Sequence, residues 1–410
     1  MLDRTESSFQ GRCPAFTQLL SPFAIEDFFE SYWQQRSLLV RGSDPGRFSA
    51  LLSLADIDEL LTVRGLGGQR IRMAKGASNT AEAISYTNEF GAFDPTKGMQ
   101  AYRDGATLIL NHLHADVLSL SEFCRAISDE LGIELQCNVY VTPADSQGFP
   151  VHYDTHDVFI VQTHGDKAWT IYDSPIHLPL AGQPHDQSGT APGPVSMQLE
   201  LREGDLLYIP RGFYHEAATA NGMSIHLTLG LMAKSWSELL LEAVSGAALE
   251  LGSLRAAPSP GFGLAAQRQE GDRYLLLQML DLVRNFVAEQ PLQAVLRPEV
   301  LYPRGRTMNG HFLDVVALDE LTPESEFALR PGHPPKLCAD GERISVMAAE
   351  TTVSFPHFAA PALERALSGE VLAITAISED LDEPAKVLLV RKLIEAGLLG
   401  LVRPKATPRS

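Results

Sequence analysis

Two histidines and an aspartate are the residues of this chain best suited to chemistry: His152, Asp154 and, further along, His215. Two imidazoles and one carboxylate in an H-x-D…H pattern form the facial ligand set of non-haem Fe(II) sites, which leaves the remaining metal positions open. A surface or hydrogen-bonded pair is the alternative interpretation, because the chain has 12 histidines and such a spacing can arise by chance. The pattern predicts a metal centre that activates dioxygen, provided that the fold brings the three side chains together.

Two strand-like segments must position these side chains. Residues 149–163 contain many β-branched and aromatic residues, which predicts a strand. Because alternate residues of a strand share a face, we expect His152 and Asp154 to project together and Tyr153 to point away. Residues 203–210 predict a turn, a short apolar strand and a proline stop before His215. A β-barrel would bring both segments together, because all of its strands line one interior.

The length and composition indicate a globular protein of two or three domains. The chain has 410 residues, of which 45% are hydrophobic and 20% are charged. Its apolar runs are too short for a membrane span, and its first residues lack the apolar core of a signal peptide. The four cysteines are scattered without a C-x-x-C pair, so we expect no disulfide framework and a cytoplasmic location.

The charge of the chain bears on its partners. A net charge of −18 is unfavourable for non-specific nucleic-acid binding, which needs Lys and Arg against phosphates. The same acidity suits a basic partner, or serves solubility alone.

The first half of the chain mixes helices with many short strands. Helices are predicted for residues 22–32, 53–61 and 119–131, and strands for 38–40 and 107–110. Residues 135–229 consist mainly of short apolar runs separated by Gly, Pro, Asp and Asn, a pattern typical of a β-barrel or sandwich.

The second half is predominantly helical. Residues 236–254 and 272–289 predict two helices, the second with a wide apolar stripe that could be core or could bury against a partner subunit. Helices at 358–367 and 384–396 and a strand at 398–402 then predict a small winged-helix domain. The last helix carries few basic residues, so we expect it to contact protein and not to bind DNA directly.

Separate blocks of this sequence resemble the JmjC-type ribosomal oxygenases, which are Fe(II)- and 2-oxoglutarate-dependent protein hydroxylases of the cupin superfamily. The resemblance covers nearly the whole chain and is carried by residues 28–33, 138–154, 157–162, 165–169, 208–217 and 224–228. It implies a mixed fold, with a double-stranded β-helix (JmjC/cupin) barrel and N-terminal helices in residues 1–232. A helical dimerisation region in 233–295 and a winged-helix domain in 296–410 would follow.

The resemblance also implies roles for individual residues. His152, Asp154 and His215 would bind Fe(II), and Lys167 would pair with the distal carboxylate of 2-oxoglutarate. The turn at residues 164–167 is compatible with this role, since a cation inside a barrel needs an anion. A solvated turn lysine is the alternative for Lys167.

Further polar residues are weaker candidates. Asn138 matches a position that helps to hold the cosubstrate or a neighbouring water, and Thr228 and Tyr140 could also contact the cosubstrate or be core polar groups. His156 is expected in the pocket wall, because a fourth protein ligand would block a substrate position.

The predicted activity is hydroxylation, with O2, of a His or Arg side chain on a protein. A basic ribosomal protein is the expected substrate and a homodimer the expected assembly. An oxygenase acting on a peptide or natural product is an alternative. Two other classes remain open: a non-redox metal cupin, which would not consume 2-oxoglutarate, and a winged-helix regulator, which would bind DNA with an affinity that falls with salt.

Overall fold

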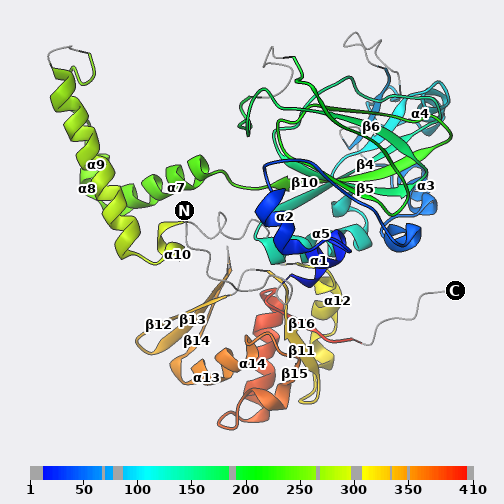
Figure 1. The fold of residues 1–410 in the computed structure, drawn as a ribbon. Coiled ribbons are helices and arrows are strands. Elements are labelled where there is room, and N and C mark those ends of the chain that lie inside the picture. Colours follow the sequence, from blue (N-terminus) through cyan, green and yellow to red (C-terminus); the bar gives the residue numbers. More distant parts are fainter. Residues whose placement is uncertain are drawn as a thin grey trace. The chain divides into compact units, whose positions relative to one another are not determined.

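The computed structural model describes residues 13–66, 70–76, 86–183, 191–264, 268–296, 307–332, 335–348 and 351–403. The chain divides into two compact units, Met1–Lys234 and Ser235–Ser410 (Figure 1). Among the described helices, none combines the length and apolar character needed to cross a bilayer.

The first unit consists of short helices around a set of antiparallel strands. In chain order these are α1 (Pro14–Leu20), α2 (Ile25–Ser31), β1 (Leu38–Val40), η2 (Pro45–Phe48), α3 (Leu54–Thr62), β2 (Ile71–Ala74), α4 (Pro95–Arg103), β3 (Thr107–Leu110), η3 (Leu113–Ala115), α5 (Leu118–Leu131), β4 (Glu134–Thr142), β5 (Asp157–His164), β6 (Lys167–Tyr172), β7 (Val195–Leu201), β8 (Leu206–Ile209), β9 (His215–Ala218) and β10 (Ser224–Met232). The helices predicted at 22–32, 53–61 and 119–131 and the strands predicted at 38–40 and 107–110 are present, with shifts of a few residues at their ends.

Two sheets form the barrel of the first unit. The large sheet has the strand order β1-β8-β5-β10-β4-β3-β2 and the small one the order β7-β6-β9. A buried cluster that includes Ile160 and Leu207 of the large sheet and Trp169 and Ile171 of the small sheet joins their inner faces. This two-sheet arrangement is a jelly-roll barrel, as the resemblance implied, and its interior is the space available for a site.

Helices cover the outer face of the large sheet, because its strands alternate in character. Along β4, Leu135, Cys137, Val139 and Val141 are buried in a core that also contains residues of α1, α2 and α5. The intervening residues of β4 face the barrel interior. Aromatic rings strengthen this core, with Phe28 of α2 centred 4.9 Å from Tyr208 of β8.

The prediction of a strand at residues 149–163 is wrong for the first half of that range. Strand β5 begins only at Asp157, and the preceding residues join the sheet through one isolated bridge, His152 to His215. Pro150 has no N–H to donate to a ladder, which favours an irregular segment at this place. His152 and Asp154, which the sequence predicts as metal ligands, therefore lie in the loop that precedes β5.

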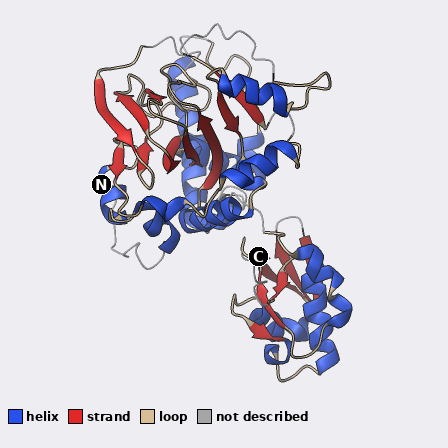
Figure 2. Cartoon of the chain, turned by 90° about the vertical axis from the view of Figure 1, so that its right-hand side faces the viewer, coloured by secondary structure: helices blue, strands red, loops and turns tan. Residues whose placement is uncertain are grey.

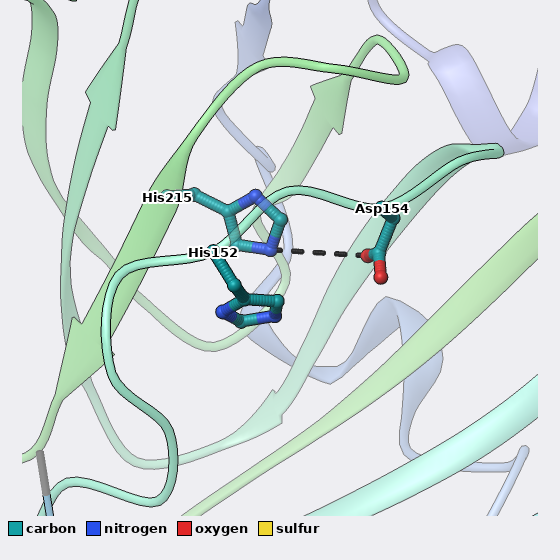
Figure 3. Close-up of side chains that lie close together, drawn as sticks. All are labelled: His152, Asp154 and His215. Carbon is teal, nitrogen blue, oxygen red and sulfur yellow. Dashed lines mark ion pairs between the residues drawn. The ribbon is translucent and has the colours of Figure 1, made fainter. Parts of the chain in front are cut away.

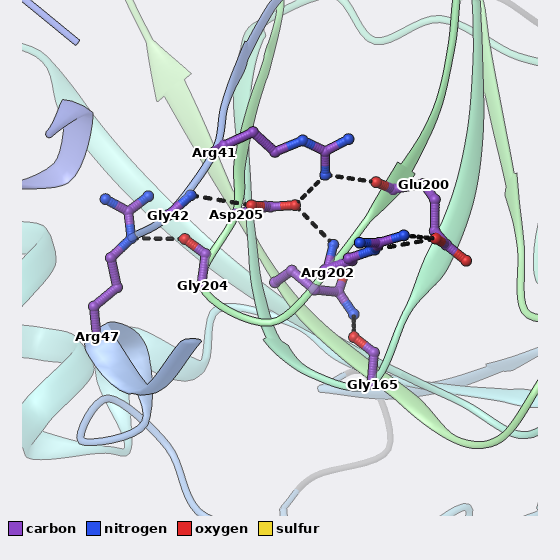
Figure 4. A network of polar contacts seen from close by, with 9 residues as sticks. Arg41, Gly42, Arg47, Gly165, Glu200, Arg202, Gly204 and Asp205 are labelled. Atoms are coloured by element: carbon purple, nitrogen blue, oxygen red, sulfur yellow. Dashed lines mark hydrogen bonds and ion pairs between the residues drawn. The ribbon is translucent and has the colours of Figure 1, made fainter. Parts of the chain in front are cut away.

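A buried carboxylate holds the turn that leads to β8. Asp205 accepts hydrogen bonds from the backbone N–H groups of Arg202 and Gly42, both at 3.0 Å, and pairs with Arg41 (Figure 4). Gly204 has a φ of +83° and lies against the backbone of Asp44, so a larger residue would not fit. The turn fixes the start of the strand that precedes His215.

The second unit contains two longer and two short helices with little core, followed by a compact α/β module. Its elements are α7 (Trp236–Glu250), α8 (Gly252–Arg255), α9 (Gln269–Glu289), α10 (Leu292–Val295), α12 (His311–Val316), η5 (Leu318–Glu320), β11 (Glu326–Leu329), β12 (Lys336–Asp340), β13 (Arg343–Ala348), β14 (Thr351–Pro356), η6 (His357–Ala359), α13 (Ala360–Ala366), β15 (Leu372–Ala373), η7 (Ile374–Ile377), α14 (Glu383–Glu395) and β16 (Leu399–Leu401). The single helix predicted for 236–254 is interrupted at Leu251, which is extended.

The two parts of the second unit have separate cores. A small cluster centred on Ala243, Ala247 and Phe286 joins α7 and α9. In the C-terminal module, the sheets β15-β11-β16 and β12-β13-β14 pack with α13 and α14 around Phe327, Val346 and other buried residues (Figure 2). Asp382 caps α14 by accepting a hydrogen bond from the N–H of Ala385, which is why this helix starts where its sequence predicts.

Candidate metal centre

The fold brings His152, Asp154 and His215 together at the mouth of the barrel (Figure 3). One ligand atom from each lies within 4.8 Å of the other two, and His215 Nε2 is 3.8 Å from Asp154 Oδ2. The side chain of Asp154 keeps 33% of its surface exposed, compared with 7% for His215. Three groups on one side of a central point, with an open side toward solvent, are the arrangement that a facial triad needs.

Both imidazoles turn Nε2 toward the centre of the cluster, because Nδ1 of each ring is engaged elsewhere. Nδ1 of His152 lies 2.9 Å from the carbonyl oxygen of Pro150, and Nδ1 of His215 lies 3.0 Å from that of Phe213. A carbonyl oxygen can only accept, so each Nδ1 carries the proton and each Nε2 keeps a free lone pair. Such a backbone partner on the far nitrogen is typical of metal-bound histidines, and the donor set therefore fits a divalent ion such as Fe(II).

The electrostatics of the triad favour the protonation states that a metal requires. Burial, and then the neighbouring His152, lower the pKa of His215 to about 4, so its imidazole is neutral at neutral pH. Enclosure raises the pKa of Asp154, but the adjacent imidazoles of His215, His156 and His152 outweigh it, and the pKa lies below its ordinary value. The site thus offers a neutral imidazole at His215 and an ionised carboxylate at Asp154.

Backbone pairing sets the spacing between the ligands. The N–H of His215 donates to His152 O at 2.7 Å, and the N–H of His152 donates to His215 O at 3.1 Å. The N–H of Gly212 donates to the carbonyl oxygen of Asp154 at 2.9 Å. These backbone hydrogen bonds join two segments that are far apart in the sequence. They, and not the shared face of one strand that the sequence predicted, align the ligands.

Lys167 lies deep in the same barrel. Its side chain is buried, with 4% of the residue exposed, and Nζ donates to Thr142 Oγ1 at 2.8 Å. Among the described residues no carboxylate pairs with it. Burial lowers the pKa of Lys167 to about 7. A buried ammonium that faces only a hydroxyl is costly unless an anion enters the pocket.

One pocket connects Lys167 with the triad. Its wall is made by Thr107, Tyr140, Gly148, Phe149, His152, Asp154, Ile160, Lys167, Trp169, His215, Ala217, His226 and Thr228. Trp169 Nε1 and His226 Nδ1 are buried without a hydrogen-bond partner in the part of the chain that the structure describes. Unpaired buried polar atoms indicate a ligand or water between them. A cation, an indole N–H and a metal site along one pocket fit a 2-oxo dicarboxylate.

The other predicted cosubstrate residues are placed differently from one another. Tyr140 and Thr228 line the pocket, and the ring of Tyr140 stacks on His226 with centroids 4.8 Å apart. Asn138 pairs with Thr228 across β4 and β10, but it is not among the described residues that line the pocket. Its Oδ1 accepts a hydrogen bond from the N–H of His112 at 2.9 Å. A role for Asn138 in holding the cosubstrate stays a prediction.

Two further histidines, His156 and His164, lie near the site in the sequence. The imidazole of His156 lies against Gly230, where an added Cβ would come within 2.8 Å of the ring. His164 is exposed at the turn after β5.

The sequence interpretation missed Thr142 and Trp169. Thr142 follows Tyr140 by two residues on β4, and Trp169 follows Lys167 by two on β6, so each shares the inward face of a residue already chosen. Extending each strand by one alternation would have found both.

Comparisons with known proteins agree with this geometry. The family model of the JmjC domain matches residues 114–239. Ribosomal oxygenase 2 of Mus musculus is 31% identical over 245 residues, which is 58% of this chain and 52% of that protein. Ribosomal oxygenase 1 of Homo sapiens is also 31% identical over 245 residues, 58% of this chain and 38% of that protein. The chain thus spans about half, or less, of the length of these relatives.

A solved structure is similar over most of the chain. The ribosomal oxygenase YcfD of Escherichia coli has 18% sequence identity and a TM-score of 0.49, with 93% of this chain and 98% of that chain covered. The matched residues 114–239 include His152, Asp154, Lys167 and His215. Residues 114–239 of this chain match the JmjC domain, and the chain is similar to ribosomal oxygenases over about 245 residues.

Proposed function

We propose that this protein is an Fe(II)- and 2-oxoglutarate-dependent oxygenase that hydroxylates a side chain of a protein. One observation carries the proposal: a His-Asp-His cluster opens into the same pocket as Lys167, a buried cation without a carboxylate partner among the described residues. A non-redox metal cupin would have no use for that cation. The cluster and the cation together favour a metal that shares its site with a dicarboxylate.

Each group of residues has a defined task in this proposal. His152, Asp154 and His215 would hold Fe(II), and Lys167, with Thr142 beside it, would bind the distal carboxylate of 2-oxoglutarate. Fe(II) with 2-oxoglutarate and O2 supplies the oxidising power that converts a C–H bond to C–OH. Trp169, Ile160 and Ala217 line the pocket and limit the access of water.

The substrate that we propose is a ribosomal protein, with hydroxylation at a His or Arg side chain. Support comes from the matched relatives, which are named ribosomal oxygenases, and from the net charge of −18, which suits a basic protein. Another relative, from Drosophila erecta, is named a bifunctional lysine-specific demethylase and histidyl-hydroxylase and is 29% identical over 248 residues. A peptide or natural-product substrate would use the same pocket.

The test uses the full chain with Fe(II), ascorbate, 2-oxoglutarate and ribosomal proteins. We expect succinate to form and a ribosomal peptide to gain the mass of one oxygen atom, and fragmentation would identify the residue. His152→Ala and Asp154→Ala should abolish both signals while the protein stays folded. A wild-type protein that converts no 2-oxoglutarate, even without substrate, would show the proposal to be wrong.

We propose that residues 233–295 form a homodimer contact. Helices α7 and α9 expose large apolar side chains, with Trp236 75%, Leu241 70% and Leu280 53% exposed. Such a surface on a helical pair favours burial against a second copy. Light scattering of the full chain tests this, and a monomer at micromolar concentration would contradict it.

For residues 296–410 we propose a winged-helix module that contacts protein. Of the cations on α14, Lys386 is buried and donates to Thr375 O, and Arg391 pairs with Asp319. Lys392 then remains exposed on that helix, which offers little attraction for phosphates. We therefore expect the protein to bind weakly to a DNA column, without the salt-dependent affinity that a DNA-binding regulator would show. The cytoplasmic location stays a prediction.

A further inference from the structure

The segment that carries His152 is poorly paired with the strand that carries His215. It touches β9 through two isolated bridges, Gln147 to Ala218 and His152 to His215. Residues 148–151 lie between these bridges, outside the β ladder. The two backbone hydrogen bonds between His152 and His215 set the spacing of these ligands, and contacts beyond this pair hold the rest of the segment in place.

The carboxylate of Glu216 makes such a contact. Its Oε2 accepts a hydrogen bond from Gln147 Nε2 at 3.1 Å, and its Oε1 accepts one from Tyr172 Oη at 2.7 Å. Gln147 Nε2 also donates to the carbonyl oxygen of Phe149 at 2.9 Å. One carboxylate of β9 therefore ties the start of the His152 segment to the end of β6.

Glu216 lies on the face of β9 that points away from the pocket. His215 and Ala217 line the pocket, so the intervening Glu216 projects to the opposite side. On the adjacent strand, Ile171 is fully buried, and Tyr172 next to it shares the outer face with Glu216. Glu216 does not touch the metal site, and it can act on the site only through the segments that it holds.

We infer that Glu216 is a positioning residue that sets the metal affinity of the triad. By clamping Gln147 and Tyr172 it keeps the His152 segment in register with His215. Without the clamp the segment would sample positions in which His152 Nε2 is displaced from the ion. The inference rests on the proposed function, because it presumes that the triad binds a metal. Loss of a hydrogen-bond partner that contacts a ligand directly typically weakens metal binding by about 10- to 100-fold, and Glu216 acts one contact further away, so the lower end is expected.

The fold should tolerate loss of the clamp. Thr219, also on the β9 side, holds the neighbouring residues independently: its N–H donates to Ser146 O at 3.0 Å, and its Oγ1 accepts from Ser146 N at 3.1 Å. The segment thus remains attached to β9 when Glu216 is replaced, and the change is confined to residues 147–152.

The experiment compares Co(II) binding to the metal-free full chain by calorimetry. We expect Glu216→Ala to weaken binding about tenfold. Tyr172→Phe removes one hydrogen bond to the carboxylate and should weaken binding less, in the same direction. Glu216→Gln can still accept one hydrogen bond and should fall between wild type and Glu216→Ala. Glu200→Ala is the matched control, since Glu200 is a carboxylate on β7 of the same sheet that pairs with Arg202 on the surface.

The outcomes separate the possible failures. Binding of Co(II) by Glu216→Ala with wild-type affinity, at a temperature where circular dichroism shows both folded, would overturn the inference. So would a lower melting temperature with unchanged affinity, because a merely structural role predicts that result. If Glu216→Ala does not fold, the affinity of Tyr172→Phe decides. A wild-type protein that binds no Co(II) contradicts the proposed function instead.

Discussion

Two buried cations, one in each unit of the chain, have opposite surroundings. Lys167 in the barrel faces the hydroxyl of Thr142. Arg330 in the C-terminal module, 5% exposed, pairs with Asp314 and donates to the carbonyl oxygens of Leu399 and Asn309. The guanidinium is satisfied by the protein, whereas the ammonium is not. The difference teaches that a buried charge supports folding when its partners are built in, and indicates a binding site when the partner must arrive from outside.

The largest effect should come from breaking the satisfied pair. Arg330→Met removes one of the two arginine partners of the buried Asp314, which keeps Arg403 at 2.8 Å, so the free energy of unfolding should fall by about 3 kcal/mol, the lower end for breaking a buried pair. Chemical denaturation of the full chain, read on the transition of the C-terminal unit, measures this. Lys167→Met is the matched control, because it removes a buried charge that has no built-in counter-ion and should leave stability unchanged or higher. If both substitutions lowered the free energy of unfolding equally, the two cations would not differ in their contribution to folding.

The next effect concerns ligand binding, for which the substitution at Lys167 should matter more than the one at Arg330. Lys167→Met should weaken 2-oxoglutarate binding by about 10- to 100-fold, the range expected for one charge-assisted hydrogen bond. Calorimetry with Co(II) in place of Fe(II) would measure it without turnover. Arg330→Met, studied at a temperature where it is folded, should bind 2-oxoglutarate as the wild type does. Wild-type affinity in Lys167→Met would show that the cation has another role.

The smallest effect is a pH dependence that only Lys167 should produce. Burial lowers the pKa of Lys167 to about 7, and a bound dicarboxylate favours the charged form. Above pH 7 the free pocket therefore holds a neutral amine, and binding must take up a proton. The affinity for 2-oxoglutarate should be constant below pH 7 and fall, by at most about tenfold per pH unit, as pH rises above it.

A conservative variant isolates this titration. In Lys167→Arg the guanidinium stays charged over the whole range, so its affinity should not vary between pH 7 and 9. A slope as steep as that of the wild type would assign the pH dependence to a different group.

Local patterns were sufficient for most elements but not for the site. The Pro and Gly boundaries correctly predicted the helix at 384–396, seen as Glu383–Glu395, because helix ends depend on nearby residues. The strand predicted at 149–163 began too early, because whether a segment joins a sheet depends on a partner far away in the sequence. His152 meets only one such partner, His215.

The sequence by itself determined which groups could bind a metal, since ligand type and the H-x-D…H spacing are properties of the chain. It also placed Lys167 at a turn beside the barrel. Only the tertiary structure decided that the lysine lies buried with Thr142, that both imidazoles turn Nε2 toward one point, and that Glu216 clamps the segment behind them. These features arise from contacts between residues far apart in sequence, and such contacts exist only after the two sheets have packed.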